Sequence, residues 1–292
     1  MVASQSDATT TKWFVRKISL RRVPPVFMTM SLIVVGLVVF LAIFGPFIEP
    51  YDPFQQDLLD TSAPPSPEHW LGTDPLGRDI LSRIIAGADS AIIGPFIVAF
   101  TGLLAGSAFG ILSGYMGGTA DMVIQRLVDF MFALPGLLIA IVIVGVVGGG
   151  YWLAVFVLSI LNIAGGVRLI RGAALEQRAL PYVEAARTLG VPRWRIMYLH
   201  IWRNISPIVF ANAALDFALA LVALSSLSYL GLGSQPGEAE WGRMLSENQS
   251  LLFSNPAGVL APALAIVFFA TSVTIIGDWI YDRFSYGGRT GR

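Results

Sequence analysis

The chain has 292 residues, of which 55% are hydrophobic and only 13% are charged, so its composition excludes an ordinary soluble globule and indicates a membrane protein. Basic and acidic residues number 19 each, so the formal net charge is zero and no basic field predicts nucleic-acid binding. Cysteine is absent, which excludes disulfides and thiolate metal sites.

The chain begins with a polar and then basic tail, residues 1–25, and continues into an apolar run over residues 26–48. This run is long enough to span a bilayer, so we expect a membrane anchor rather than a cleaved signal. Five more apolar runs each reach the roughly 20 residues that a spanning helix needs. They cover residues 91–114, 127–147, 151–170, 205–231 and 258–280. The sequence therefore predicts an all-α polytopic membrane protein with six transmembrane helices.

The basic residues predict how these helices are oriented. Of the 19 lysines and arginines, five lie in the N-terminal tail, seven between residues 168 and 203, and three near the C-terminus. Cytoplasmic segments carry the excess of positive charge, so we expect both termini and the 171–203 loop in the cytoplasm. The expected domains are a cytoplasmic tail (1–25), a first transmembrane helix (26–48), an extracytoplasmic loop (49–87), a transmembrane domain of five helices (88–282) and a cytoplasmic tail (283–292).

Small residues in the second span predict a contact between helices. Glycine recurs every four residues at Gly102, Gly106, Gly110, Gly114 and Gly118. This period places the glycines near one face, where a neighbouring helix can approach the backbone closely.

The third and fifth spans contain polar and helix-breaking residues. Arg126 and Asp129 are spaced so that they can pair on one helix, and Pro135 predicts a kink. Asn212 and Asp216 lie one turn apart in the fifth span. Acids inside a membrane are costly and tend to face cavities, so Asp216 either hydrogen-bonds a neighbouring helix or lines a translocation path.

Charged residues separate the fourth and fifth spans between residues 180 and 204. Pro181 suits the first turn of a helix, and Gly190 suits the left-handed residue just past its end. They frame a helix of about nine residues, roughly 13 Å long. Pro192 can then start a second helix that re-enters the membrane.

The surface of this short helix has the outline of a docking site. Ala185 and Ala186 leave part of the helix nearly flat, so a groove on another protein can close on the backbone there. Glu184 and Arg187 offer polar contacts at the rim. An ordinary amphipathic connector is the alternative.

Several stretches resemble one family of membrane transport proteins. Glu184-Ala185-Ala186, followed after three residues by Gly190, resembles the EAA loop, the cytoplasmic coupling helix by which ABC importer permeases hold their ATP-binding subunits. Three other stretches resemble the oligopeptide, dipeptide and nickel importers within that group. They are HWLGTDPLGRD at residues 69–79, GYMGG at 114–118, and LSYLGLGSQP at 227–236 with Trp241-Gly242 after it. The chain is thus similar to the C-type permease subunits of peptide importers.

This resemblance implies a type I ABC importer permease bundle in the cytoplasmic membrane. The implied partners are a second permease subunit, two ATP-binding subunits and an extracytoplasmic substrate-binding protein. ATP and Mg²⁺ would bind in the ATP-binding subunits and no cofactor in this chain, which is not expected to be an enzyme. Its only lysines, Lys12 and Lys17, lie in a tail without glycine, so it has no phosphate-binding loop.

Three departures from the family leave the cargo open. Trp202-Arg203 replace the usual Leu-Pro pair, Leu224 stands where an acidic residue is frequent, and Asp89 stands where a basic residue is common. A permease for nickel or another small solute is therefore an alternative. A self-sufficient secondary transporter would need coupling charges near the bilayer midplane, where Asp216 is the only acid and lacks an obvious basic partner. An intramembrane hydrolase would need paired catalytic groups, yet His69 and His200 fall on opposite expected faces.

Overall fold

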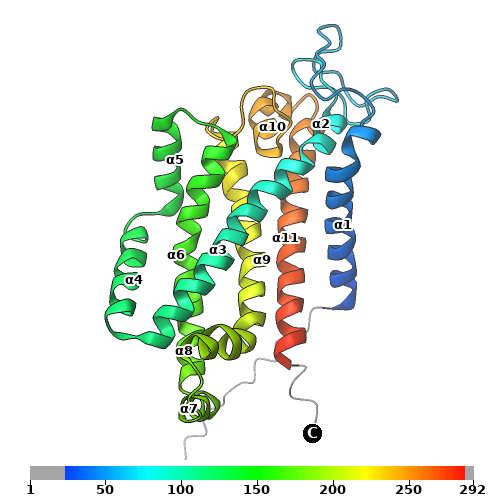
Figure 1. Cartoon of the computed structure of the whole chain (residues 1–292). Helices are drawn as coiled ribbons and strands as arrows, with labels where there is room; N and C mark the ends of the chain where they lie inside the picture. Colours follow the sequence, from blue (N-terminus) through cyan, green and yellow to red (C-terminus); the bar gives the residue numbers. More distant parts are fainter. Residues whose placement is uncertain (1–23, 287–292) are drawn as a thin grey trace, which may run out of the picture.

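The computed structural model describes residues 24–286 (Figure 1), so residues 1–23 and 287–292 of the two predicted tails lie outside the described residues. Within that range the chain is helical apart from its loops and one isolated bridge between Thr73 and Asp79. The helices are α1 (Pro25–Ile48), α2 (Ile80–Ala86), α3 (Ala88–Met116), α4 (Gly118–Met131), α5 (Gly136–Val147), α6 (Tyr151–Arg178), α7 (Pro181–Thr188), α8 (Arg193–Arg195), α9 (Trp202–Tyr229), α10 (Trp241–Glu247) and α11 (Ala257–Tyr286), with a π-helical segment at Ile196–Ile201 and a 3₁₀ turn at Gln249–Leu252.

Five helical segments among the described residues are long and apolar enough to cross a membrane, and a bent pair makes a sixth span if it is counted as one. The five confirm the predicted first, second, fourth, fifth and sixth spans, although several extend further than predicted. They are Pro25–Ile48, Ile80–Met116, Tyr151–Arg178, Arg193–Tyr229 and Ala257–Phe284.

The third predicted span is not one kinked helix. It is the pair α4 and α5, which are bent by 70° at a break between Met131 and Gly136. Pro135 lies just before α5 and disfavours helical geometry at the residue before it, so the chain leaves the helix here rather than kinking within it. The prediction of a proline-induced bend holds, whereas the prediction of a continuous helix is wrong.

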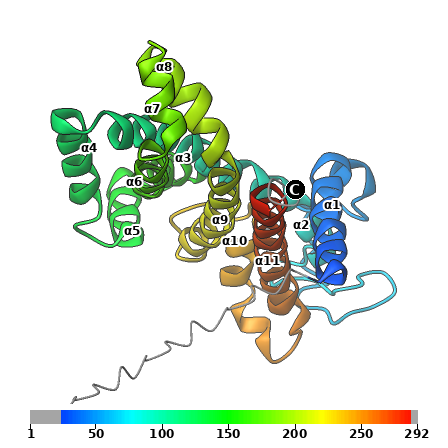
Figure 2. The same cartoon turned by 90° about the horizontal axis from the view of Figure 1, so that it is seen from below.

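The helices form a row in which sequence neighbours are not always spatial neighbours. Viewed along the bundle, α1 and α11 lie at one side, α9 and the pair α3 and α6 lie in the middle, and α4 and α5 lie at the other side (Figure 2). The start of α1, the end of α11 and α7 all lie at the same end of the bundle (Figure 1). We call this the α7 end; α10 and the loop over residues 49–79 lie at the opposite end.

The glycine row brings α3 against α6, which is the most extensive helix contact in the fold. A methyl group built on Gly106 would lie 2.9 Å from the backbone of Gly166, and one on Gly114 would lie 2.8 Å from Ala174. Gly102 and Gly110 are similarly crowded by α6. The predicted contact is therefore present for these four glycines. Gly118 does not belong to it, because a methyl group there would meet nothing within 4 Å.

Helix α4 is tied to α6 by two ion pairs. Asp121 accepts two hydrogen bonds from the Arg171 guanidinium, at 2.6 and 2.7 Å, and Asp129 pairs with Arg168 at 2.8 Å. The predicted pairing of Arg126 with Asp129 on one helix is therefore wrong. Asp129 has its partner on the neighbouring helix instead.

Candidate functional site

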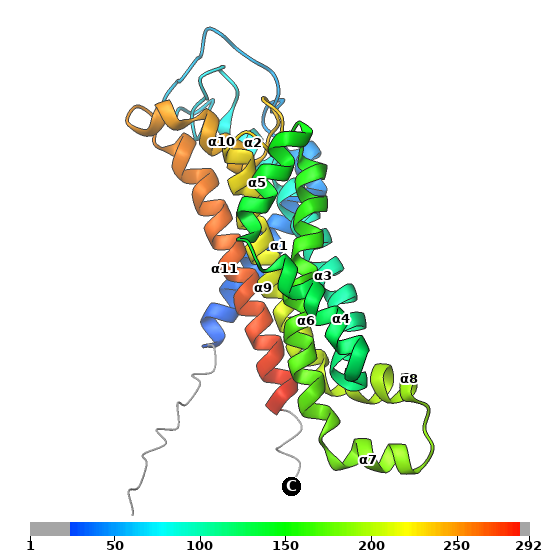
Figure 3. The ribbon, with the colours of Figure 1, turned by 90° about the vertical axis from the view of Figure 1, so that its left-hand side faces the viewer.

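Helix α7 lies across the end of the bundle, and the chain turns back after it into α8 and α9 (Figure 3). Pro181 occupies its first turn, as predicted. Val183 and Ala186 face the bundle, 0% and 8% exposed, and pack in a cluster that includes Ile170 and Ile196. This apolar stripe fixes α7 against the ends of α3, α6 and the π-helical segment.

The end of α7 has the turn that the sequence predicts. Gly190 has φ +73°, in the left-handed region that favours glycine. Its N–H donates to the carbonyl of Arg187 at 3.0 Å, and the next N–H, of Val191, donates to the carbonyl of Ala186 at 3.0 Å. This hydrogen-bond pair is the Schellman motif, which satisfies the last carbonyls of a helix while the chain reverses.

The open face of α7 carries most of the residues of the predicted docking surface. Glu184, Ala185 and Arg187 are exposed. Ala186 is buried against the bundle, so it cannot form part of a flat outer face, and that detail of the prediction is wrong. Two large apolar side chains, Leu189 and Trp194, are 81% and 59% exposed close to the same turn in the sequence. The α7 end thus presents charged, small and apolar groups to its surroundings.

Arg187 links the exposed helix to the bundle. Its Nε donates to the hydroxyl of Tyr115 at 3.2 Å, and its guanidinium lies 4.9 Å from the centre of the Tyr115 ring. Tyr115 is only 5% exposed and belongs to the last turn of α3. Arg187 therefore joins α7 to α3 through both a hydrogen bond and a cation–π contact.

The return into the membrane begins with a helical irregularity that the sequence analysis missed. Residues Ile196–Ile201 form a π-helical segment, and the N–H of Trp202 bonds the carbonyl five residues earlier, on Met197. His200 Nδ1 lies 3.0 Å from the carbonyl oxygen of Arg195, so Nδ1 carries the hydrogen that is donated. No residue type in this stretch indicates a π-helix. The only signal was that Trp202-Arg203 replace the Leu-Pro pair usual in the family, which pointed to an unusual start of α9.

Asn212 and Asp216 lie far from α7, inside the bundle. The Asn212 amide donates to the Asp216 carboxylate at 2.9 Å. A methyl group built on Gly102 would lie 2.3 Å from Asn162 and 3.6 Å from Asp216, so residues of α3, α6 and α9 meet here. Within residues 24–286, Asp216 has no basic side chain within 4.0 Å. An acid among amides can bind a polar group that passes along the bundle.

A buried ionic cluster at the opposite end was not predicted. Arg78 and Arg83 fall in the predicted extracytoplasmic loop (49–87), yet they are only 2% and 0% exposed. Glu247 accepts from Arg78 at 2.7 Å and from Arg83 at 3.0 Å, and Arg78 also pairs with Asp74 at 2.6 Å. The cluster joins the 69–79 stretch to α10, whose Trp241 donates to the carbonyl of Ile84 at 3.0 Å. Asp74, Arg78 and Trp241 lie in stretches that resemble one family, whereas no sequence signal marked Arg83 or Glu247.

The described part of the chain contains no group of three or more histidine, aspartate or glutamate side chains arranged to hold a metal ion. The described residues thus offer exposed charged, small and apolar groups at α7, a buried ionic cluster at the α10 end, and polar side chains between α3, α6 and α9.

Comparison with known proteins places these features in a family. Residues 106–286 match the family described as binding-protein-dependent transport system inner membrane component, and residues 28–65 match the N-terminal TM domain of oligopeptide transport permease C. The chain is 36% identical over 253 residues to the probable D,D-dipeptide transport system permease protein of Escherichia coli (strain K12), covering 86% of this chain and 85% of the relative. It is 35% identical over 249 residues to the glutathione transport system permease protein of Pectobacterium atrosepticum, with 84% and 82% covered.

Two further comparisons agree. The dipeptide transport system permease protein of Alkalihalophilus pseudofirmus is 33% identical over 252 residues, covering 86% of this chain and 83% of the relative. A solved chain of the inward-facing MetNI methionine ABC transporter superposes with a TM-score of 0.57 at 16% identity, covering 70% of this chain and 96% of the other. At that identity the likeness concerns the fold alone, which is that of an ABC transporter permease.

Proposed function

The chain belongs to the family of binding-protein-dependent transport system inner membrane components, and we propose that it is the permease subunit of an ATP-driven importer that carries small peptides across the cytoplasmic membrane. Relatives named for D,D-dipeptides, dipeptides and glutathione support this class of cargo. A nickel or other small-solute importer is the alternative. The proposed partners are a second permease subunit, two ATP-binding subunits that hold ATP and Mg²⁺, and an extracytoplasmic substrate-binding protein.

In the proposed orientation the α7 end faces the cytoplasm, together with both termini. The basic residues between 168 and 203 support this orientation, because seven of the 19 lysines and arginines lie there. The 49–87 segment would then face outward, where a substrate-binding protein delivers cargo.

The observation that carries the proposal is the construction of α7. One face is buried through Val183 and Ala186, whereas Glu184, Ala185 and Arg187 remain open. A helix held in this way can receive a partner without losing its place on the bundle. We therefore assign α7 as the coupling helix that contacts an ATP-binding subunit.

The same contacts indicate how a displacement of α7 is transmitted to the membrane helices. Arg187 holds Tyr115 of α3, and α3 is in backbone contact with α6 along the glycine row. Two helices in such close contact cannot slide without steric overlap, so they move together. ATP-driven displacement of α7 would therefore tilt the α3 and α6 pair relative to α9 and α11.

Replacing Gly190 by valine tests the coupling role. A branched residue in the left-handed conformation costs roughly 1–2 kcal/mol or forces the turn to change. A methyl group at Gly190 would meet nothing within 4 Å, so this strain is conformational rather than steric. We expect Gly190→Val and Glu184→Ala to insert and to pair with the second permease subunit, but to lose the ATP-binding subunits or peptide uptake in a pull-down and vesicle transport assay.

The matched control for this experiment is Gly190→Asn. Asparagine adopts the left-handed conformation more easily than valine, so it should retain most of the binding and uptake. If Gly190→Val and Glu184→Ala both bind the ATP-binding subunits and transport normally, α7 is only a connector.

For Asp216 and Asn212 we propose a position on the wall of the translocation path. Asp216→Asn keeps the shape of the side chain but removes its charge. We expect normal assembly and uptake slower by about tenfold, the loss when a hydrogen bond to a charged group worth roughly 1.4 kcal/mol disappears. Unchanged uptake in assembled vesicles would leave Asp216 with a purely structural role.

A further inference from the structure

Two adjoining cavities open at the end of the bundle opposite α7. The first, about 580 Å³, lies between the end of α1, the loop after it and the start of α3. The second, about 530 Å³, lies between the start of α3, the turn before α6 and residues 234–240. Phe54, Ala86 and Asp89 line both, so Asp89 stands where the cavities meet.

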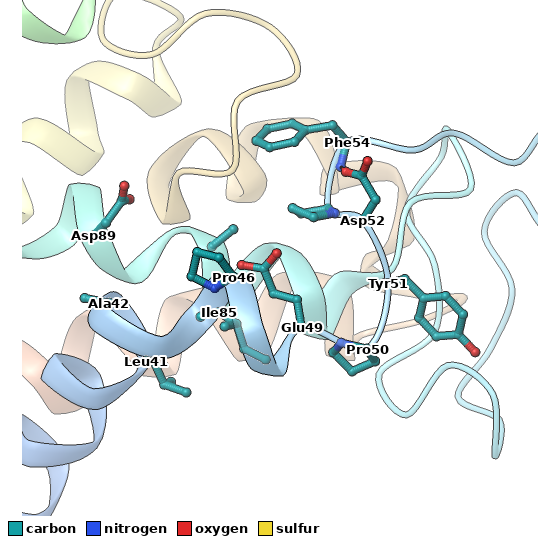
Figure 4. A pocket seen from close by; sticks show the side chains of 13 residues that line it. Leu41, Ala42, Pro46, Glu49, Pro50, Tyr51, Asp52, Phe54, Ile85 and Asp89 are labelled. Atoms are coloured by element: carbon teal, nitrogen blue, oxygen red, sulfur yellow. Dashed lines mark hydrogen bonds between the residues drawn. The ribbon is translucent and has the colours of Figure 1, made fainter.

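Carboxylates dominate the polar lining of the two cavities. Figure 4 shows Glu49, Asp52 and Asp89 around the first, from the end of α1, the following loop and the start of α3. Glu238 and Glu240 line the second. Burial disfavours the charged form of Glu49 and raises its pKa, and the negative charges of Asp52 and Asp89 raise that pKa further.

The arginines of this end are already engaged elsewhere. Arg78, Arg83 and Arg243 bind Asp74 or Glu247. Within residues 24–286, no lysine, arginine or histidine nitrogen lies within 4.0 Å of the carboxylates that line the two cavities. The carboxylates of the two cavities therefore have no basic partner within the described part of the chain.

The second cavity also has aromatic walls and a hydroxyl group without a partner. Phe54, Tyr151 and Trp152 line it, and their rings favour a cation over their faces. Ser234 lines it too and is only 3% exposed, yet its hydroxyl has no hydrogen-bond partner in the described structure. Buried polar groups are normally hydrogen-bonded, so the free hydroxyl indicates a missing polar partner.

We propose that this second cavity binds the primary ammonium group of a small solute, such as the amino end of a peptide. Asp89 supplies the principal charge, the rings of Phe54, Tyr151 and Trp152 flank the cation, and the buried Ser234 hydroxyl turns toward the cavity to accept one of its N–H bonds. An ammonium group fits better than a metal ion, because the described residues offer no cluster of three metal ligands. A peptide as natural ligand rests on the proposed function, whereas ammonium binding itself does not.

Binding is measured on the full-length chain in phosphatidylglycerol nanodiscs, which contain no lipid amine. The probes are the dipeptide Ala-Ala and its N-acetyl derivative, followed by saturation-transfer NMR. We expect Ala-Ala to bind, N-acetylation to abolish the signal, and Asp89→Asn to weaken binding by about tenfold, as for loss of one charged hydrogen bond. Asparagine retains the size of the side chain, so the helix start should be preserved.

Glu68→Gln is the matched control, because Glu68 is an exposed acid of the same end that lines neither cavity. It removes the same charge and should leave Ala-Ala binding unchanged. Equal binding of the acetylated probe, or equal loss in Glu68→Gln, would overturn the proposal. If added phosphatidylethanolamine occupies the cavity and Ala-Ala does not bind, the ligand is a lipid headgroup. That result would also overturn the proposal.

The outcome is separable from that of the proposed function. ATP-driven uptake by the complete transporter tests the proposed importer function. This uptake can be observed even if the isolated chain does not bind the ammonium group. Conversely, Asp89-dependent Ala-Ala binding by the isolated chain stands even if no ATP-driven uptake is found.

Discussion

Replacing Glu247 by alanine should lower the free energy of unfolding by roughly 3–5 kcal/mol, the cost of leaving buried charge without its partner. This single carboxylate binds Arg78, Arg83 and Arg243, at 2.7, 3.0 and 3.1 Å. Without it Asp74 alone remains to pair with Arg78 and Arg83, which are almost fully buried, and Arg243 loses its carboxylate partner. Denaturant unfolding in detergent, followed by fluorescence, measures the loss. An unfolding curve equal to that of the unmodified chain would show that water or a rearrangement of side chains compensates for the lost carboxylate.

Glu68→Ala is the control, since it removes an exposed carboxylate from the same end. Glu247→Gln adds a test by pH. Burial alone would raise the pKa of Glu247, but the Gly237 N–H and the charges of Arg83 and Arg78 hold it below its ordinary value. A lowered pKa stabilises the fold fully above the ordinary pKa of about 4.5, and this contribution disappears as the pH falls through the folded-state pKa. The difference in the free energy of unfolding between Glu247→Gln and the unmodified chain should therefore become smaller below about pH 4.5.

Alanine at Gly166 should destabilise the bundle, whereas alanine at the adjacent Gly165 should not. A methyl group on Gly166 would lie 2.9 Å from the carbonyl oxygen of Gly102, which is backbone and cannot rotate away. Forcing α3 and α6 apart costs about 1–3 kcal/mol. At Gly165 the methyl group meets nothing within 4 Å, so the higher helix propensity of alanine adds up to about 1 kcal/mol of stability.

The two variants differ by one position in the same helix and by nothing in chemistry, so each is the control for the other. Thermal unfolding of the purified chain in detergent gives the comparison. Equal melting temperatures for Gly165→Ala and Gly166→Ala would mean that the α3 and α6 contact is loose.

Local signals in the sequence predicted the local structure well. Apolar runs predicted the spans because hydrocarbon demands about 20 apolar residues, and Gly190 predicted its turn because positive φ is a property of one residue. The start of α4 was missed for the same reason, since Asp121 and Arg126 interrupt its apolar pattern. Asp121 nevertheless lies in the first turn of α4, where a negative charge is favoured, and it pairs with Arg171 of α6.

Long-range contacts explain what sequence reasoning could not predict. Arg83 and Glu247 are separated by 164 residues, and neither residue type alone indicates burial. Helical spacing offers Asp129 a partner in Arg126 on its own helix, yet the packing of α4 on α6 pairs it with Arg168 instead. The candidate coupling helix was found because its turn chemistry is local, whereas the inward face of Ala186 depends on the bundle against which it packs.

The π-helical segment before α9 has a consequence for the evolution of this chain. One residue added to or removed from an α-helix rotates everything beyond it by about 100° and shifts it by about 1.5 Å. Residues 191–201 form the stalk between α7 and the membrane part of α9, so a change in its length would turn Glu184 and Ala185 away from their present direction. A π-helical turn is the form that a single inserted residue takes when the helix on either side keeps its register. Because the stalk already contains one such turn, we expect it to tolerate substitutions more readily than further insertions or deletions, and homologous chains should conserve its length better than its sequence.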